Sequence, residues 1–168
     1  MYEIRKITPN EVDDAIKLSE YSFKYKLEGE KRQQRAEFMS DHIVFGAFAS
    51  SEMIAKTHVI PLGVVINDQE YAMGGIASVS TYPEHRRKGI VNQLMEQALL
   101  TMREEGHTLS YLHPFDISFY RRYGYELISN LKKTTVLAKD LIYYKDVSGT
   151  VVRKNGFEDL GVVNEIYS

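Results

Sequence analysis

The sequence contains no cysteine, and this absence excludes several kinds of chemistry at once. Without a thiol there is no disulfide, no thiolate nucleophile and no cysteine-ligated zinc. A strong charge of either sign is also missing: the net charge is -2, so no overall basicity attracts nucleic acid or an anionic membrane. Residues 1–6 lack the apolar run of a signal peptide, and no stretch reaches 18 uninterrupted apolar residues. We therefore expect a cytoplasmic protein that binds neither nucleic acid nor membrane.

Two common nucleotide-binding motifs are missing as well. The sequence contains neither GxxxxGK[ST] nor GxGxxG, which argues against an ATPase and against a dinucleotide-dependent dehydrogenase. What remains is an ordinary globular composition, with 43% hydrophobic and 26% charged residues among 168. That length suits one well-buried domain.

Hydrophobic periodicity predicts an α/β domain with a mixed sheet. The expected strands cover residues 2–7, 43–49, 54–66, 70–82, 109–112 and 126–138. The expected helices begin at residues 8–11 and cover residues 29–39, 89–104 and 116–122. Asn67-Asp68 reads as a turn, and alternation in the next strand predicts one shared face for Tyr71, Met73, Ala77 and Val79.

The join between the fourth strand and the third helix, "VSTYPEHRRKGIVNQLMEQAL", is the most informative stretch. A helix that begins near Gly89 directs unpaired backbone N–H groups and its positive dipole end at one point, which attracts anions. Arg86, Arg87 and Lys88 add positive charge there. A pyrophosphate would be held mainly by the amides, although RRKG taken by itself favours a solvated basic turn.

A second motif, "HPFDISFYRRYGYE", covers residues 113–126. Together the two motifs resemble the GNAT superfamily of N-acetyltransferases, whose coenzyme loop reads [RQ]xxGx[GA]. Arg86 and Gly89 match that loop, whereas Val91 stands where a small residue is usual. A branched residue after RRKG, combined with FYRRYGYE, is similar to the Eis-like (enhanced intracellular survival) subfamily. The resemblance covers about residues 2–141 and implies a GNAT-type α/β fold, with a mixed, largely antiparallel central sheet flanked by helices.

The resemblance also implies acetyl-CoA as the cosubstrate, with no metal. Backbone groups of Val79, Ser80 and Thr81 would pair with the pantetheine arm, and the amide of Val79 would polarise the thioester carbonyl. The side chain of Val91 would point into the sheet, away from the phosphate. The residues implied to hold the pyrophosphate are Arg86, Arg87, Lys88, Gly89, Ile90, Val91 and Asn92, and Phe115 and Asp116 are implied to contact the coenzyme.

Tyr120 is the catalytic residue that the resemblance implies, in the role of general acid. A tyrosine with a pKa near 10 keeps its proton at neutral pH and can donate it to a departing thiolate. The plain alternative is a packing tyrosine, one of 12 in the chain. Tyr123 and Tyr125 are expected in the core or in the sheet.

The acceptor would be a primary amine, either a small molecule of the aminoglycoside type or a lysine-containing partner. Such an amine arrives protonated, with a pKa of about 10.4 if it resembles lysine. In the Eis-like subfamily the base is the carboxylate of the C-terminus, after a second acetyltransferase-like domain and a sterol-carrier-like domain, neither of which this sequence contains. The candidates within the chain are His113, His42, Asp41, Glu28 and Glu30.

The tail "TVVRKNGFEDLGVVNEIYS" loosely repeats the opening "YEIRKITPNEVDDAIKLSEYS". A repeat of this kind indicates a duplicated unit. We therefore expect an acetyltransferase domain over residues 1–142, and a linker with the start of a second GNAT-like domain over residues 143–168. The chain would be the N-terminal part of a longer protein, and whether it forms a homo-oligomer stays open.

Two other functions compete with this interpretation. The first is a catalytically inactive acyl-CoA-binding regulatory module, against which Tyr120 in its full motif argues. The second is an interaction domain that uses the basic loop to bind nucleic acid or protein. The charge balance argues against its nucleic-acid form.

Overall fold

The computed structural model describes residues 2–142, 148–150, 152–153, 161–162 and 165. The chain divides into two compact units, Met1–Ile128 and Ser129–Ser168. Within the described residues, every helix is too short or too polar to cross a membrane. Most of the tail that was predicted to repeat the opening lies outside the described residues, so the domain boundary at residue 142 stays a prediction.

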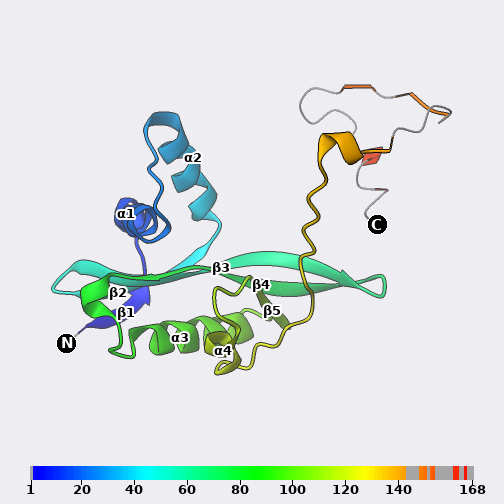
Figure 1. Cartoon of the computed structure of the whole chain (residues 1–168). Coiled ribbons are helices and arrows are strands. Elements are labelled where there is room, and N and C mark those ends of the chain that lie inside the picture. Colours follow the sequence, from blue (N-terminus) through cyan, green and yellow to red (C-terminus); the bar gives the residue numbers. More distant parts are fainter. Residues whose placement is uncertain (1, 143–147, 151, 154–160, 163–164, 166–168) are drawn as a thin grey trace. The chain divides into compact units, whose positions relative to one another are not determined.

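Five strands form one sheet, and their spatial order follows the chain (Figure 1). Neighbours from β1 to β4 pair antiparallel, and β4 pairs parallel with β5. This arrangement confirms the mixed, largely antiparallel sheet. The strands are β1 (Glu3–Lys6), β2 (Ile43–Ala49), β3 (Glu52–Ile66), β4 (Gln69–Thr81) and β5 (Leu109–Leu112).

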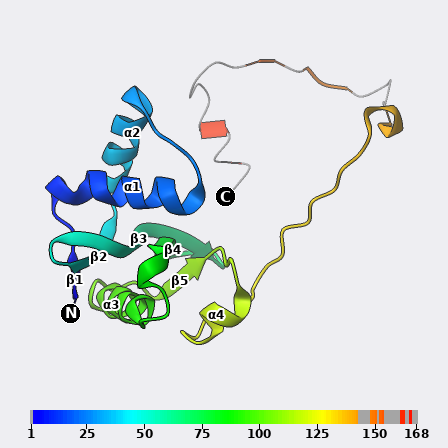
Figure 2. The same cartoon turned by 60° about the vertical axis from the view of Figure 1, so that its left-hand side comes forward.

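Helices cover both faces of the sheet (Figures 1 and 2). On one face lie α1 (Val12–Phe23), which follows a short 3₁₀ helix (Pro9–Glu11), and α2 (Gly29–Ser40). On the other face lie α3 (Ile90–Glu104) and α4 (Ile117–Arg121). The α3 follows a second 3₁₀ helix (Pro83–His85), and a third (Ala138–Asp140) belongs to the second unit.

Each face has its own hydrophobic core, because successive side chains of a strand point to opposite faces. In β2, Val44 and Phe48 pack with α1, whereas Phe45 and Ala47 pack with α3. The apolar side of α3 fills the second core with Ile90, Leu94, Met95, Ala98 and Met102.

The hairpin between β3 and β4 turns at the predicted residues. Asn67 and Asp68 both have positive φ, 51° and 61°, as a two-residue turn between right-twisted strands requires. Asn and Asp tolerate this conformation better than most residues.

A β-bulge interrupts β4 close to its end. Ala77 lies opposite His58 and Ser80 opposite Lys56, so β4 fits one more residue than β3 into this interval. Ser78 has a φ of 54°. Because of the bulge, Val79 packs in the core that contains Ile76. The prediction that Val79 shares a face with Ala77 is therefore wrong.

The strand predicted over residues 126–138 is not formed. Residues 126–137 lie outside helices and strands, and their side chains are exposed. The sequence pattern there favours an extended chain, but a strand also needs a neighbouring backbone with which to exchange hydrogen bonds.

Candidate functional site

The sheet opens between β4 and β5. Their pairing runs from Met73 opposite Leu109 to Ile76 opposite Leu112 and ends there, whereas β4 continues to Thr81. Beyond the bulge, the backbone of residues 79–81 therefore has no β5 partner. An extended ligand can add to this edge as a further strand would.

A pocket of about 520 Å³ lies at this opening, a volume typical of small-molecule sites. The elements that line it are the end of β4, the loop before α3, the first turn of α3, the end of α1 and the α4 region. The lining residues are Ser22, Phe23, Val79, Ser80, Thr81, His85, Arg86, Arg87, Gly89, Ile90, Val91, Asn92, Phe115, Phe119 and Arg122.

The pocket brings together most of the residues predicted for the coenzyme. Of the residues predicted to bind the coenzyme, Lys88 and Asp116 do not belong to the pocket lining. The predicted catalytic residue, Tyr120, does not belong to it either. Sequence reasoning missed Ser22, Phe23, His85, Phe119 and Arg122. Of these, Phe119 and Arg122 lie within the FYRRYGYE motif, which was the available signal.

The N-terminus of α3 lines the pocket. Gly89 is the residue that precedes the helix, and its φ of 75° lies in the left-handed region that favours glycine. The first turn of a helix leaves its N–H groups without partners inside the helix, so they are available to an anion. Arg86 donates from Nε to the carbonyl of Thr81 at 3.3 Å, which ties the loop to the end of β4. Val91 packs against the core and also lines the pocket.

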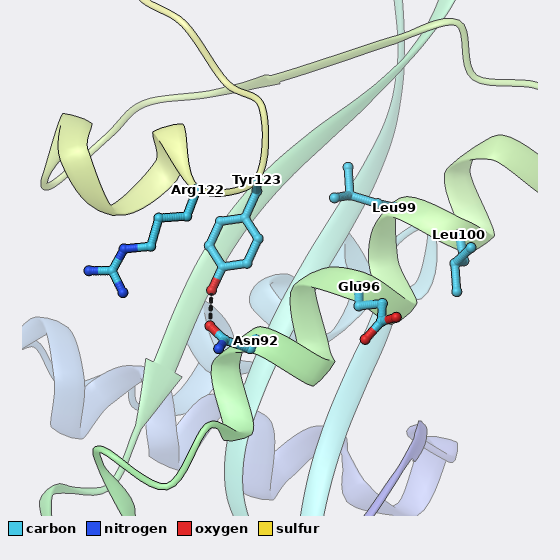
Figure 3. A pocket seen from close by; sticks show the side chains of 6 residues that line it. All are labelled: Asn92, Glu96, Leu99, Leu100, Arg122 and Tyr123. Carbon is cyan, nitrogen blue, oxygen red and sulfur yellow. Dashed lines mark hydrogen bonds between the residues drawn. The ribbon is translucent and has the colours of Figure 1, made fainter.

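Asn92 connects this pocket to a second hollow of about 510 Å³ on the outer side of α3 (Figure 3). The hydroxyl of Tyr123 donates a hydrogen bond to Oδ1 of Asn92. Arg122 lines both hollows. Tyr123 thus contacts a predicted phosphate-binding residue, and it also packs against the core as the sequence predicted.

Tyr120 lies on α4 with only 5% of its surface exposed. Its ring contacts Phe115 and Phe119 edge-on, with centroids 5.4 and 5.0 Å away. Both phenylalanines line the pocket, so Tyr120 contacts the pocket lining without belonging to it. Burial raises its pKa above 10, and the nearby Tyr125 and Tyr123 raise it further. Tyr120 therefore keeps its proton at neutral pH.

Asp116 caps α4. Its Oδ1 accepts hydrogen bonds from the Ser118 hydroxyl at 2.6 Å and from the Phe119 amide at 2.9 Å. These bonds lower the pKa of the carboxyl group. The structure thus places the carboxylate of Asp116 at the start of the helix that carries Tyr120.

None of the five predicted base candidates lines the pocket. Glu28 pairs with Lys26 at 2.7 Å, and Glu30 accepts a hydrogen bond from Gln34 at 3.0 Å. Asp41 ends α2, and His113 is an exposed residue directly after β5.

His42, the fifth candidate, has a titratable neighbour. Its ring packs edge-on against Phe38, and its Nδ1 lies 3.4 Å from Nδ1 of His58. Burial lowers the pKa of His42.

Sequence reasoning also missed a buried polar cluster around Lys56 and His58, with exposed fractions of 0% and 4%. The available signal was a lysine and a histidine inside the otherwise apolar strand "MIAKTHVI".

Residues 3–128 match the acetyltransferase (GNAT) domain family. The chain therefore belongs to the GNAT acetyltransferase family.

Two relatives of this chain are described as acyl-group transferases. It is 23% identical over 137 residues to an uncharacterized N-acetyltransferase from Streptomyces avermitilis, covering 80% of this chain and 33% of the relative. A conserved protein of unknown function from Enterococcus faecalis, described as a probable N-acyltransferase, superimposes with a TM-score of 0.72 at 28% identity. That match covers 75% of this chain and 32% of the other. The chain thus spans about a third of the length of these relatives.

Two further structures share the fold. A predicted acetyltransferase from Clostridium acetobutylicum, solved with acetyl-CoA, has a TM-score of 0.68 and 12% identity over 80% of this chain and 96% of the other. Eis1 from Mycobacterium abscessus has a TM-score of 0.65 and 20% identity, over 74% of this chain and 31% of the other.

Proposed function

We propose that this domain transfers an acetyl group from acetyl-CoA to a primary amine by direct attack, with Tyr120 as the general acid. The observation that carries the proposal is the pocket between the free edge of β4 and the N-terminus of α3. An extended thiol arm and a pyrophosphate need these two features side by side.

The coenzyme would use the backbone more than the side chains. Its pantetheine arm would pair with residues 79–81, and its pyrophosphate would accept hydrogen bonds from the amides of residues 87–91. Arg86, Arg87 and Lys88 would neutralise the remaining charge. The acetyl-CoA complex of the Clostridium acetobutylicum protein supports acetyl-CoA as the donor.

In the reaction, the amine nitrogen attacks the thioester carbonyl carbon, a C–N bond forms and the C–S bond breaks. The departing thiolate takes the phenolic proton of Tyr120, and the proton that the attacking nitrogen loses as the amide forms restores the phenol. Support comes from the raised pKa of Tyr120 and from its ring contacts with Phe115 and Phe119, which line the pocket.

The proposal places the domain in an Eis-like, cytoplasmic enzyme with an aminoglycoside-like or lysine-like acceptor. Support comes from Val91 after RRKG, from FYRRYGYE and from the fold shared with Eis1. A domain over residues 1–142, followed by a linker into a second unit, is consistent with a chain that spans about a third of its relatives.

The test is release of free coenzyme A, followed with a thiol reagent, in the presence of acetyl-CoA and a panel of amines. The panel contains aminoglycosides, spermidine and lysine-containing peptides. We expect release that depends on the amine. Calorimetric binding of acetyl-CoA without release for any amine would instead indicate an inactive acyl-CoA-binding module.

A further inference from the structure

Four polar side chains form a hydrogen-bonded chain on the α1 side of the sheet. Lys56 Nζ lies 2.6 Å from Ser78 Oγ and 2.9 Å from His58 Nε2. His58 Nδ1 lies 3.4 Å from His42 Nδ1. We call these residues, in the order Ser78, Lys56, His58 and His42, the Lys56 chain.

The two ends of the Lys56 chain lie in different surroundings. Ser78 is the bulged residue of β4, half-buried, and directly precedes Val79 of the pocket lining. Its hydroxyl is also 3.2 Å from Ser19 Oγ of α1. His42, at the other end, is half-exposed just before β2. The Lys56 chain therefore runs from beside the pocket, through the interior, to a side chain that contacts water.

The interior of the Lys56 chain disfavours positive charge. Burial lowers the pKa of Lys56 to about 7, and Arg35 of α2 lowers it further. Burial also takes the pKa of His58 well below its usual 6.5, with further contributions from Lys56, His42 and Arg35. Asp41, beside His42, acts in the opposite direction on His42. A neutral amine is thus available inside the domain near neutral pH, bonded to groups that can exchange protons with it.

We propose that the Lys56 chain is a proton relay that removes the proton of the acceptor amine. This proposal rests on the proposed acetyl transfer. It supplies a route for a proton that must leave before the nitrogen can attack, and the route begins at Ser78, the residue before Val79 of the pocket lining.

The relay carries one proton from the acceptor amine to solvent through four side chains. The acceptor ammonium gives a proton to Ser78 Oγ while the Ser78 hydroxyl proton moves to the neutral amine of Lys56. The resulting ammonium passes one proton to His58 Nε2, and the proton on His58 Nδ1 moves to Nδ1 of His42. His42 then releases its Nε2 proton to water. One proton has moved from the acceptor to solvent, and the free amine attacks the thioester.

Lys56→Met tests the relay, because methionine keeps an unbranched side chain in the core and cannot carry a proton. The readout is kcat for an alkylamine from the panel and for an arylamine, which is uncharged at neutral pH. For the alkylamine we expect a loss of at least about tenfold at about pH 7, which shrinks towards pH 10 as the amine deprotonates in solution. For the arylamine we expect nearly the wild-type rate. If the wild type does not acetylate an arylamine, the test rests on how the loss of kcat for the alkylamine changes with pH.

Two further variants separate proton transfer from packing. His42→Gln breaks the half-exposed end of the relay, so it should show a smaller loss with the same dependence on pH and acceptor. Thr57→Val is the matched control. Thr57 stands between Lys56 and His58 in the sequence and is also buried, but its hydroxyl has no hydrogen-bond partner among the described residues. In Thr57→Val, kcat should depend on pH and on the acceptor amine as it does in the wild type.

A loss in Lys56→Met that is equal at every pH and for both amines would overturn the relay, as would an unchanged rate. Calorimetry with coenzyme A should give the same affinity for Lys56→Met and the wild type. A wild-type protein that acetylates no amine would instead contradict the proposed function, so the two failures are distinguishable.

Discussion

The hydroxyl of Tyr123 donates a hydrogen bond to Oδ1 of Asn92, and this bond joins the segment after α4 to the first turn of α3 (Figure 3). With its oxygen occupied, the amide of Asn92 has its N–H donors left for a ligand in the pocket that it lines. The motif that carries Tyr120 is thereby connected to the proposed pyrophosphate site.

Tyr123→Phe should weaken acetyl-CoA binding about fivefold. The substitution removes a hydrogen bond worth about 1 kcal/mol, and without it the amide of Asn92 is no longer oriented towards the ligand. Titration calorimetry measures the affinity. The matched control is Tyr71→Phe, whose hydroxyl bonds to Gln69 on the β3–β4 hairpin at 3.0 Å. Equal affinities for the two variants would show that Tyr123 does not orient Asn92.

Gly89→Ala should destabilise the domain by about 1 kcal/mol, since φ is 75° and an alanine there is strained although its Cβ meets no atom within 4 Å. It should also weaken acetyl-CoA binding, because the amides that follow Gly89 shift. Gly106→Ala is the control, with φ 81° and the same open space, at the other end of α3. Urea unfolding and calorimetry should show similar destabilisation for both variants and weaker binding for Gly89→Ala alone.

Tyr120→Phe should lower kcat at least about tenfold, or about 1.4 kcal/mol in the barrier, because the thiolate then leaves without its proton donor. The affinity for acetyl-CoA should stay unchanged, since Tyr120 does not belong to the pocket lining and phenylalanine keeps its ring contacts. Steady-state kinetics with the best amine of the panel gives the comparison. Turnover close to that of the wild type would assign Tyr120 to packing.

The stability of the domain should depend on Lys56 in the direction set by its lowered pKa. Below about pH 7 the amine is charged in both states, and the folded state bears the full cost of burying it. Between about 7 and 10.5 only the unfolded state holds the proton, so the free energy of unfolding rises, by at most about 1.4 kcal/mol per pH unit.

Lys56→Met removes this contribution, so the stability gained by the substitution should be largest below about pH 7 and should shrink towards pH 10.5. Urea unfolding of both proteins across this pH range measures the difference in their free energies of unfolding. The contributions of the other titrating groups largely cancel in that difference. A difference that does not change with pH would mean that Lys56 keeps its ordinary pKa in the folded domain.

Local patterns predicted most of the secondary structure. The turn at Asn67-Asp68, the helix that begins after Gly89 and the short β5 all lie where the sequence placed them. Each depends on side-chain periodicity or on backbone preferences within a few residues. The strand predicted over residues 126–138 failed because its formation depends on a partner, which its own residues do not encode.

Within the candidate site, the motifs singled out the loop before α3, which lines the pocket, but they did not predict the hydrogen bonds that its residues and those of α4 make. The pocket contains Val79 and Gly89 as predicted, whereas Asp116 caps α4. The Lys56 chain was missed because its members come from β3, from β4 and from the residue before β2, and only the pairing of the strands brings them within hydrogen-bonding distance.

The sequence by itself determined the order of helices and strands up to α4, the glycine that precedes α3 and the two motifs of an acetyltransferase, because these depend on neighbouring residues. Tertiary structure alone decided where β4 bulges, where β4 parts from β5 and what surrounds Lys56. The reason is physical: a bulge and a strand opening are properties of paired backbones. The lowered pKa of a lysine likewise arises from the segments that exclude water from it.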